Sequence, residues 1–175
     1  MVDINETGVV TTHIGEPADD QSWLVNRLGD CIESVTLDVN TFVSSTLAAK
    51  TIVDNDPDNT VVYIKSGIPL VKITSGTSTG LYGPYEAAAK DGRNGVIEGV
   101  LESQFTVEFN RSGVKVPVVT AGMRYTGVID TTKLPLDVTG AKWEGLFLNR
   151  PAEGSPATIL SNAPAAATTS SGAGA

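Results

Sequence analysis

The sequence has few of the residue types that build metal centres and nucleophilic sites. Its 175 residues include one cysteine, Cys31, and one histidine, His13. A single cysteine excludes an intramolecular disulfide, and one histidine with one cysteine cannot supply the ligands of a zinc site. His13 lies in a polar segment near the start of the chain, where a general base would be poorly held. The sequence therefore predicts no catalytic, metal or cofactor-binding residues.

Positive charge is scarce as well. The chain carries 12 Lys and Arg residues against 20 Asp and Glu residues, which gives a formal net charge of -8. Because nucleic-acid binding needs clustered cations and the cations here are scattered, no nucleic-acid partner is expected. An acidic exterior favours a basic or neutral protein partner.

The chain also lacks any apolar run long enough to cross a membrane. Its first residues, Met1 to Glu6, carry neither the basic nor the apolar region of a secretory signal. We therefore expect no secretory signal and no membrane partner.

Three regions differ in composition. Residues 1–21 are polar and acidic and carry too little apolar surface to fold alone, which predicts a flexible N-terminal arm. Residues 22–150 alternate short apolar runs with turn residues, which predicts one β-rich domain. Residues 151–175 are rich in Ala, Ser, Thr and Gly, so we expect a flexible tail.

The runs in the middle region are spaced like the strands of a small all-β sandwich or barrel. Val35, Leu37 and Val39 alternate with polar residues and predict one strand. Further strands are expected at 61–65, 69–74, 96–101, 105–109, 114–119 and 125–129. Helix is scarce, and the one short helix predicted, near 138–146, has Thr139 as its cap.

An acidic segment has the start of a calcium loop but lacks its end. Asp54, Asp56 and Asp58 have the spacing of the first calcium ligands. The sixth position is Asn59 where the loop needs Gly, and the twelfth is Lys65 where it needs the bidentate Glu. We therefore expect a solvated acidic turn and no metal.

Two short motifs resemble those of trimeric dUTP pyrophosphatases. Arg111-Ser112-Gly113 resembles the phosphate-binding motif, and Gly127 to Asp130 resembles the motif with the catalytic aspartate. The Tyr and Gly-Glu that continue the second motif are missing after Asp130. A simpler interpretation of Arg111-Ser112-Gly113 is a hairpin turn between two strands. This enzyme remains an alternative, but no residue is assigned a catalytic role.

A carbohydrate-binding module is another alternative, because small β-domains with exposed aromatic residues often bind sugars. Aromatic residues make up only 6% of the chain. They do not recur on one face of any predicted strand, so the aromatic platform of such a module is not visible.

The most informative segment is Lys65 to Arg93. It contains K-I-T at Lys72 to Thr74, Y-G-P-Y at Tyr82 to Tyr85, and D-G-R at Asp91 to Arg93. Pro69 fits the first position of the strand that ends in K-I-T. Pro84 fixes its own φ, so we interpret Y-G-P-Y as a turn with a tyrosine on each side.

These three motifs, in this order and spacing, resemble the signature of phage head decoration proteins of the lambda head decoration protein D-like family, actinophage type. Weaker similarity extends over residues 22–150 and includes Ser22-Trp23-Leu24. The resemblance implies a small all-β domain of β-barrel or β-tulip type with little helix and no cofactor.

It also implies a virion protein that is made in the host cytoplasm and binds the exterior of the capsid. Members of the family form homotrimers on the major capsid protein at local three-fold positions and stabilise the expanded head. The candidate partner-binding residues are Trp23, Leu24, Tyr82 and Tyr85. For Trp23 we favour packing in its own domain over insertion into a capsid pocket, since most tryptophans next to strands are buried.

Overall fold

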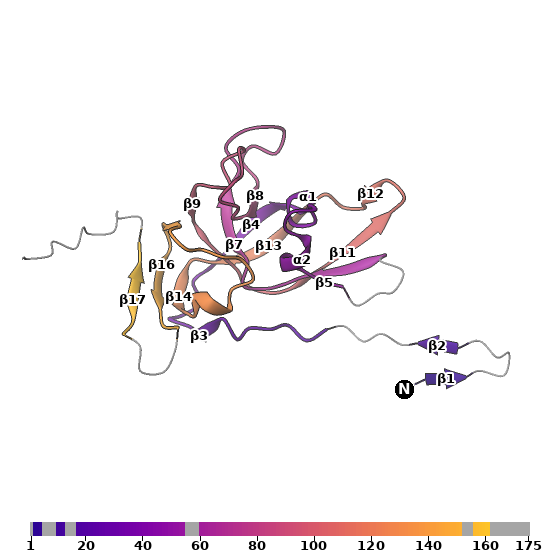
Figure 1. Cartoon of the computed structure of the whole chain (residues 1–175), viewed down its shortest axis with the longest axis horizontal. Helices are drawn as coiled ribbons and strands as arrows, with labels where there is room; N and C mark the ends of the chain where they lie inside the picture. Colours follow the sequence, from indigo (N-terminus) through magenta and orange to yellow (C-terminus); the bar gives the residue numbers. More distant parts are fainter. Residues whose placement is uncertain (1, 5–9, 13–16, 55–59, 152–155, 162–175) are drawn as a thin grey trace, which may run out of the picture.

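The computed structural model describes residues 2–4, 10–12, 17–54, 60–151 and 156–161. Their regular structure is almost entirely β-strand (Figure 1), which confirms the predicted all-β class. The described helices are short: α1 (Val39–Phe42), α2 (Ala48–Thr51) and the 3-10 turn η1 (Thr131–Lys133).

A closed barrel of five strands forms the centre of the domain. Their order around the barrel is β10 (Gly99–Leu101), β13 (Val118–Arg124), β4 (Ile32–Asp38), β8 (Tyr82–Pro84) and β7 (Pro69–Lys72). The longest pairing joins β4 and β13 in antiparallel register, with Ile32 opposite Arg124 and Asp38 opposite Val118. Barrel closure removes the open edges that would otherwise invite association.

Smaller sheets surround the barrel. One has the order β12-β11-β6-β5 and consists of β5 (Ile52–Asp54), β6 (Val61–Ile64), β11 (Phe105–Asn110) and β12 (Gly113–Val114). A second has the order β17-β16-β14-β3 and consists of β3 (Leu24–Asn26), β14 (Thr126–Ile129), β16 (Leu146–Asn149) and β17 (Thr158–Leu160). Two-stranded sheets are formed by β9 (Val96–Ile97) with β15 (Lys142–Trp143), and by β1 (Val2–Ile4) with β2 (Val10–Thr12). Figure 1 shows β16 and β17 at the left and the β11–β12 hairpin at the right.

Two hydrophobic cores share part of the barrel wall. The first core includes Leu37, Phe42, Ile64, Leu70, Leu101 and Met123. The second core includes Trp23, Val71, Tyr85, Val100, Trp143 and Phe147. Successive side chains of a strand point to opposite faces. Accordingly, β7 sends Leu70 to the first core and Val71 to the second, and β10 divides Leu101 and Val100 in the same way.

The prediction of a helix near 138–146 is wrong. The chain turns at Gly140, whose φ is +74°, and then forms β15 and the start of β16. Trp143 and Phe147 are four residues apart, a spacing that would place them on one face of a helix. They lie on two strands instead and meet edge-on in the second core, with ring centroids 5.3 Å apart.

The prediction of a turn at Y-G-P-Y is also wrong, because the first three of these residues form strand β8. Tyr82 lies opposite Lys72 of β7 on one side and Leu37 of β4 on the other. The strand predicted over 114–119 is interrupted, since β12 ends at Val114 and β13 begins at Val118. Arg111 and Ser112 do form the predicted hairpin turn, with Asn110 opposite Gly113.

Both ends of the chain contribute more to the domain than composition predicted. Within the predicted arm, Pro17 O accepts a hydrogen bond from Gln104 Nε2 at 2.6 Å, and Asp20 O accepts one from Ser66 Oγ at 3.0 Å. Within the predicted tail, β17 pairs with β16, and Leu160 packs against the second core. Residues 17–21 and 158–160 therefore belong to the domain. The other predicted flexible segments, apart from β1, β2 and the residues next to β17, lie outside the described residues.

Candidate partner-binding surface

The three signature motifs come together at the end of β7. β8 runs beside β7, and Thr74 N donates a hydrogen bond to Asp91 O at 2.9 Å. Glu86 N donates to Arg93 O at 3.1 Å, which joins the segment after β8 to the D-G-R step. We call residues 69–93 the signature unit, because the order and spacing of the motifs correspond to one folded element.

Arg93 is the central side chain of the signature unit. Its side chain is 11% exposed, its Nε donates to Asp91 Oδ2 at 2.9 Å, and its Nη1 lies 3.1 Å from Glu86 Oε2. Nη1 also donates to Pro84 O at 3.4 Å. Burial raises the pKa of Asp91, but the hydrogen bonds from Arg93 outweigh burial and hold that pKa below its usual value. Two carboxylates thus compensate one largely buried guanidinium.

Two glycines of the signature are required by close approaches. Gly92 has φ +103°, and a Cβ there would lie 2.9 Å from the backbone nitrogen of Thr74 and against its hydroxyl. A Cβ at Gly83 would lie 2.6 Å from Arg93 Cδ and 2.8 Å from Thr41 Oγ1. Real Cβ atoms are not found at such distances, so both positions need a residue without a side chain.

Two of the four predicted partner-binding residues are buried. Trp23 is 1% exposed, and its Nε1 donates to Ser66 Oγ at 3.2 Å. A Cβ at Gly67 would lie 2.6 Å from the indole ring, so this glycine makes room for Trp23. Tyr85 is 8% exposed in the same core. Neither ring is accessible to a partner in this conformation, and Trp23 packs in its own domain, as favoured.

The other two predicted residues are half-buried. Leu24 lies on β3 beside the second core, whereas Tyr82 packs against the first core, so the four residues do not form one surface. The Tyr82 hydroxyl donates to Glu98 Oε2 at 2.5 Å, and Lys72 Nζ lies 6.0 Å from the ring centroid. Burial, followed by the bond to Glu98, raises the pKa of Tyr82. Tyr82 therefore stays a neutral donor.

Next to Tyr82 is a hollow that the sequence did not reveal. It is about 510 Å³ in volume, and its lining includes Glu33, Glu98, Glu144, Tyr125 and Leu146. We call it the acidic hollow. All three carboxylates also lie close enough to Tyr82 to contribute to its raised pKa. They come from distant parts of the chain, so no sequence spacing predicts the cluster. No group of three or more potential metal ligands is placed to hold a metal ion in the part of the chain that the structure describes.

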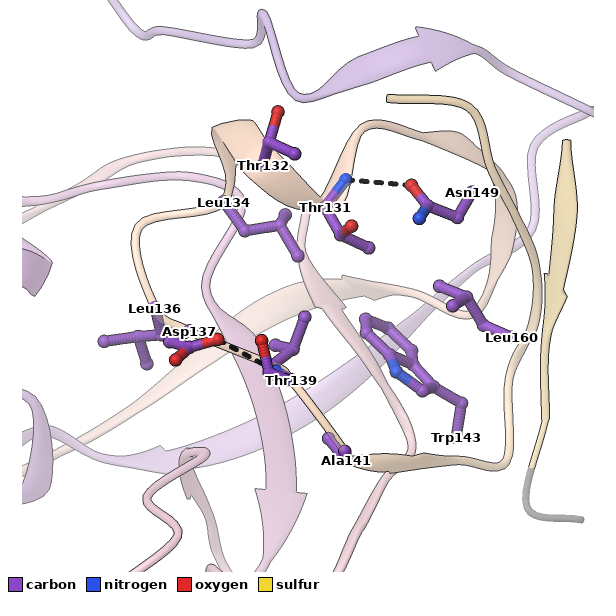
Figure 2. Close-up of a pocket in the computed structure, with 12 residues that line it drawn as sticks. Thr131, Thr132, Leu134, Leu136, Asp137, Thr139, Ala141, Trp143, Asn149 and Leu160 are labelled. Carbon is purple, nitrogen blue, oxygen red and sulfur yellow. Dashed lines mark hydrogen bonds between the residues drawn. The ribbon is translucent and has the colours of Figure 1, made fainter. Parts of the chain in front are cut away.

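A second hollow of about 510 Å³ lies between η1 and β16 (Figure 2). Its polar groups already bind one another: Thr131 N donates to Asn149 Oδ1 at 3.1 Å, and Thr139 N donates to Asp137 Oδ1 at 2.9 Å. Trp143 contributes to the lining but is only 2% exposed. It therefore offers no aromatic platform for a sugar.

The pyrophosphatase-like and calcium-like motifs have local roles or cannot be placed. Asp130 is 2% exposed, and its Oδ1 accepts hydrogen bonds from Thr132 N at 3.0 Å and Thr132 Oγ1 at 2.6 Å. Asp130 is thus the N-cap of η1. Arg111 lies at the exposed hairpin turn after β11. Asp56 and Asp58 lie outside the described residues.

Comparisons with family models, with curated proteins and with solved structures found no match to this chain. Within the described ranges, no helix is both long enough and apolar enough to cross a membrane.

Proposed function

We propose that this chain is a head decoration protein of a tailed phage. In this proposal it binds the exterior of the expanded head as a homotrimer, at local three-fold positions of the major capsid protein, and stabilises the shell. The observation that carries the proposal is the signature unit. The motifs on which the resemblance rests are joined by Thr74 and Arg93 into one element of a small β-domain. This favours a shared fold over three chance matches.

The N-terminal segment supports the same proposal. β1 and β2 pair only with each other among the described strands. A two-stranded sheet alone is marginally stable in water, so this hairpin gains stability by adding to the exposed sheet edge of a partner. Residues 17–21 fix the base of the segment to the domain through Gln104 and Ser66.

The mechanism would be mechanical and would involve no cofactor or turnover. Each trimer would engage neighbouring capsid subunits through three arms, so that the second and third contacts form at high effective concentration. The net charge of -8 suits a basic or neutral capsid surface. The added contacts would resist the internal pressure of packaged DNA.

The test compares the intact chain with a variant that lacks residues 1–16. This deletion removes β1 and β2 but keeps Pro17 to Gln21, which bind the domain. Expanded, undecorated capsids from the tailed phage that would carry this gene serve as the target. We expect the intact chain to co-sediment with them and to raise the temperature of DNA release, and the deletion variant to lose most of its affinity.

Circular dichroism of the deletion variant provides the control, because its spectrum and melting temperature should match those of the intact chain apart from the lost hairpin. Light scattering should give the mass of a trimer, either in solution or after capsid binding. Failure of the intact chain to bind expanded capsids would overturn the proposal. Equal decoration by both forms would remove the arm from the mechanism.

A further inference from the structure

Exposed apolar side chains are concentrated on one sheet. Eight large apolar side chains are exposed among the described residues. Val25, Leu146 and Ile159 belong to strands of the sheet β17-β16-β14-β3. Leu28 and Tyr125 lie within two residues of its strands, whereas Ile32 is the first residue of the barrel strand β4. Single exposed apolar residues are ordinary, but a concentration of them indicates an interaction surface.

Strand register places several of these residues on one face. Phe147, Gly127 and Leu160 are cross-strand partners, and Phe147 is fully buried in the second core. Because side chains alternate along a strand, the residues before and after them point away from the core. This opposite side, which we call the outer face, carries Ile159, Leu148 and Val128 in one row, and Leu146 and Thr126 in another.

The outer face is apolar and open. Leu146 is 66% exposed and Ile159 is 68% exposed, so no described segment covers the face at these positions. None of its five residues is charged. β17 is moreover an edge strand of the sheet, and in Figure 1 it lies at the outer limit of the domain.

The acidic hollow adjoins the outer face. Leu146 and Thr126 belong to the outer face and also line the hollow with Glu33, Glu98 and Glu144. None of the three carboxylates forms an ion pair with a described cation. Other carboxylates of the domain do, for example Glu102 with Arg124 and Glu86 with Arg93.

The charge of the hollow selects the kind of occupant. A second copy of this acidic chain docked face to face would bring its own three carboxylates to the contact. A partner segment that carries Lys or Arg beside apolar residues would cover the outer face and pair with the carboxylates. We propose that the outer face and the acidic hollow together form a docking surface for an apolar, lysine- or arginine-bearing segment of a different protein. The inference is independent of the capsid proposal.

The test uses a short fluorescent peptide of alternating leucine and lysine with the full-length chain. We expect binding by fluorescence anisotropy, with amide shifts in the ¹⁵N spectrum confined to β14, β16, β17 and the residues of the hollow. Peptides of alternating leucine and glutamate, or serine and lysine, should bind much more weakly. Leu146→Ser should weaken the leucine-lysine peptide about tenfold, as expected for a lost contact of about 1.4 kcal/mol.

Matched variants separate this site from general surface effects. Val116→Ser, at a residue that is 55% exposed and lines a different hollow with Thr106 and Glu108, should leave binding unchanged. Glu33→Gln combined with Glu144→Gln should weaken binding at low salt and reduce its salt dependence, whereas Glu108→Gln should do neither.

Three outcomes would overturn the inference: no binding of the leucine-lysine peptide, equal binding of the leucine-glutamate peptide, or amide shifts located elsewhere. A fourth is a wild-type oligomer that Leu146→Ser with Ile159→Ser converts to a monomer, because the outer face would then be a contact between copies. That result would leave the capsid proposal standing. If the intact chain fails to bind capsids but binds the leucine-lysine peptide, the capsid proposal is overturned and the docking surface stands.

Discussion

The first and second cores differ in how the chain builds them. The first core is mainly aliphatic and is filled from the barrel, β6 and β11, whose side chains alternate in sequence. The second core contains both tryptophans, and it draws Trp23 and Leu160 from near the two ends of the chain. The comparison teaches that the barrel depends on local alternation, whereas the second core depends on long-range closure. Because β7 and β10 serve both cores, we expect the two to unfold together.

The largest expected effect tests this shared wall. Trp23→Ala removes one of the two tryptophans of the second core, and we expect it to lower the free energy of unfolding by about 3–5 kcal/mol. Urea unfolding followed by far-UV circular dichroism measures the loss. Val25→Ala, at a residue that is 47% exposed, is the control and should change stability by less than about 0.5 kcal/mol.

The same experiment asks whether the cores are one unit. Tryptophan fluorescence reports only on the second core, because Trp23 and Trp143 both lie there, whereas circular dichroism reports on all strands. In the wild type the two transitions should coincide. A fluorescence transition at lower urea than the circular dichroism transition would show that the second core opens alone.

The sequence predicted the first core better than the second for a physical reason. Val35 and Leu37 alternate with more polar neighbours, so the period alone identified the second half of β4 and its buried face. Val39, expected on the same strand, is the first residue of α1. Trp143 and Phe147 are four residues apart, a spacing that also fits a helix. Only the turn at Gly140 and the pairing of β16 with β14 place them on strands. Tertiary contacts determine the secondary structure of this segment, and they could not be inferred from its local sequence pattern.

The second prediction concerns an ion pair at the junction of the cores. Arg124 of β13 is fully buried, and its Nε and Nη2 donate to Glu102 at 2.6 and 3.0 Å. Its Nη1 donates to Gly29 O at 3.0 Å, which joins the barrel to the segment after β3. Arg124→Met leaves Glu102 with the exposed Arg27 as its one remaining cation partner among the described residues. We expect a loss of about 3 kcal/mol in urea unfolding.

A double variant separates charge from packing. Arg124→Met with Glu102→Leu removes both charges, so stability should return to within about 1 kcal/mol of the wild type. No recovery in the double variant would mean that the bonds from Arg124 to backbone carbonyls, and not its pairing with Glu102, hold the junction together.

The candidate binding residues were predicted less well than the fold. The three motifs of the signature segment form one unit. However, Trp23 and Tyr85 are buried. The sequence could not separate them from exposed binding residues, because an aromatic residue near a strand gives no signal that tells a core ring from an exposed one. The acidic hollow was missed since Glu33, Glu98 and Glu144 meet only after folding.

The third prediction tests the signature unit through its backbone. Gly92 and Gly80 both have positive φ, but only Gly92 has a neighbour in the way, since a Cβ at Gly80 meets nothing within 4 Å. Gly92→Ala should therefore cost about 2 kcal/mol in thermal or urea unfolding, and Gly80→Ala about 1 kcal/mol. Equal losses would mean that φ alone, and not the approach of Thr74, makes Gly92 necessary.

The smallest expected effect is the pH dependence of the same unit. The hydrogen bonds from Arg93 hold the pKa of Asp91 below its usual value in the folded chain. The stability that Asp91 contributes is therefore complete above the unfolded-state pKa, near 3.8, and is lost as pH falls through the lower folded pKa. Asp91→Asn removes the charge but keeps the size of the side chain. It should cost up to about 1 kcal/mol at pH 7, because the carboxylate is one-third exposed and Glu86 still pairs with Arg93.

In urea unfolding at a series of pH values, the difference in stability between Asp91→Asn and the wild type should shrink below about pH 4 and disappear in strong acid. A difference for Asp91→Asn that persists unchanged in acid would mean that hydrogen-bond geometry, and not the charge of Asp91, holds Arg93 in the signature unit.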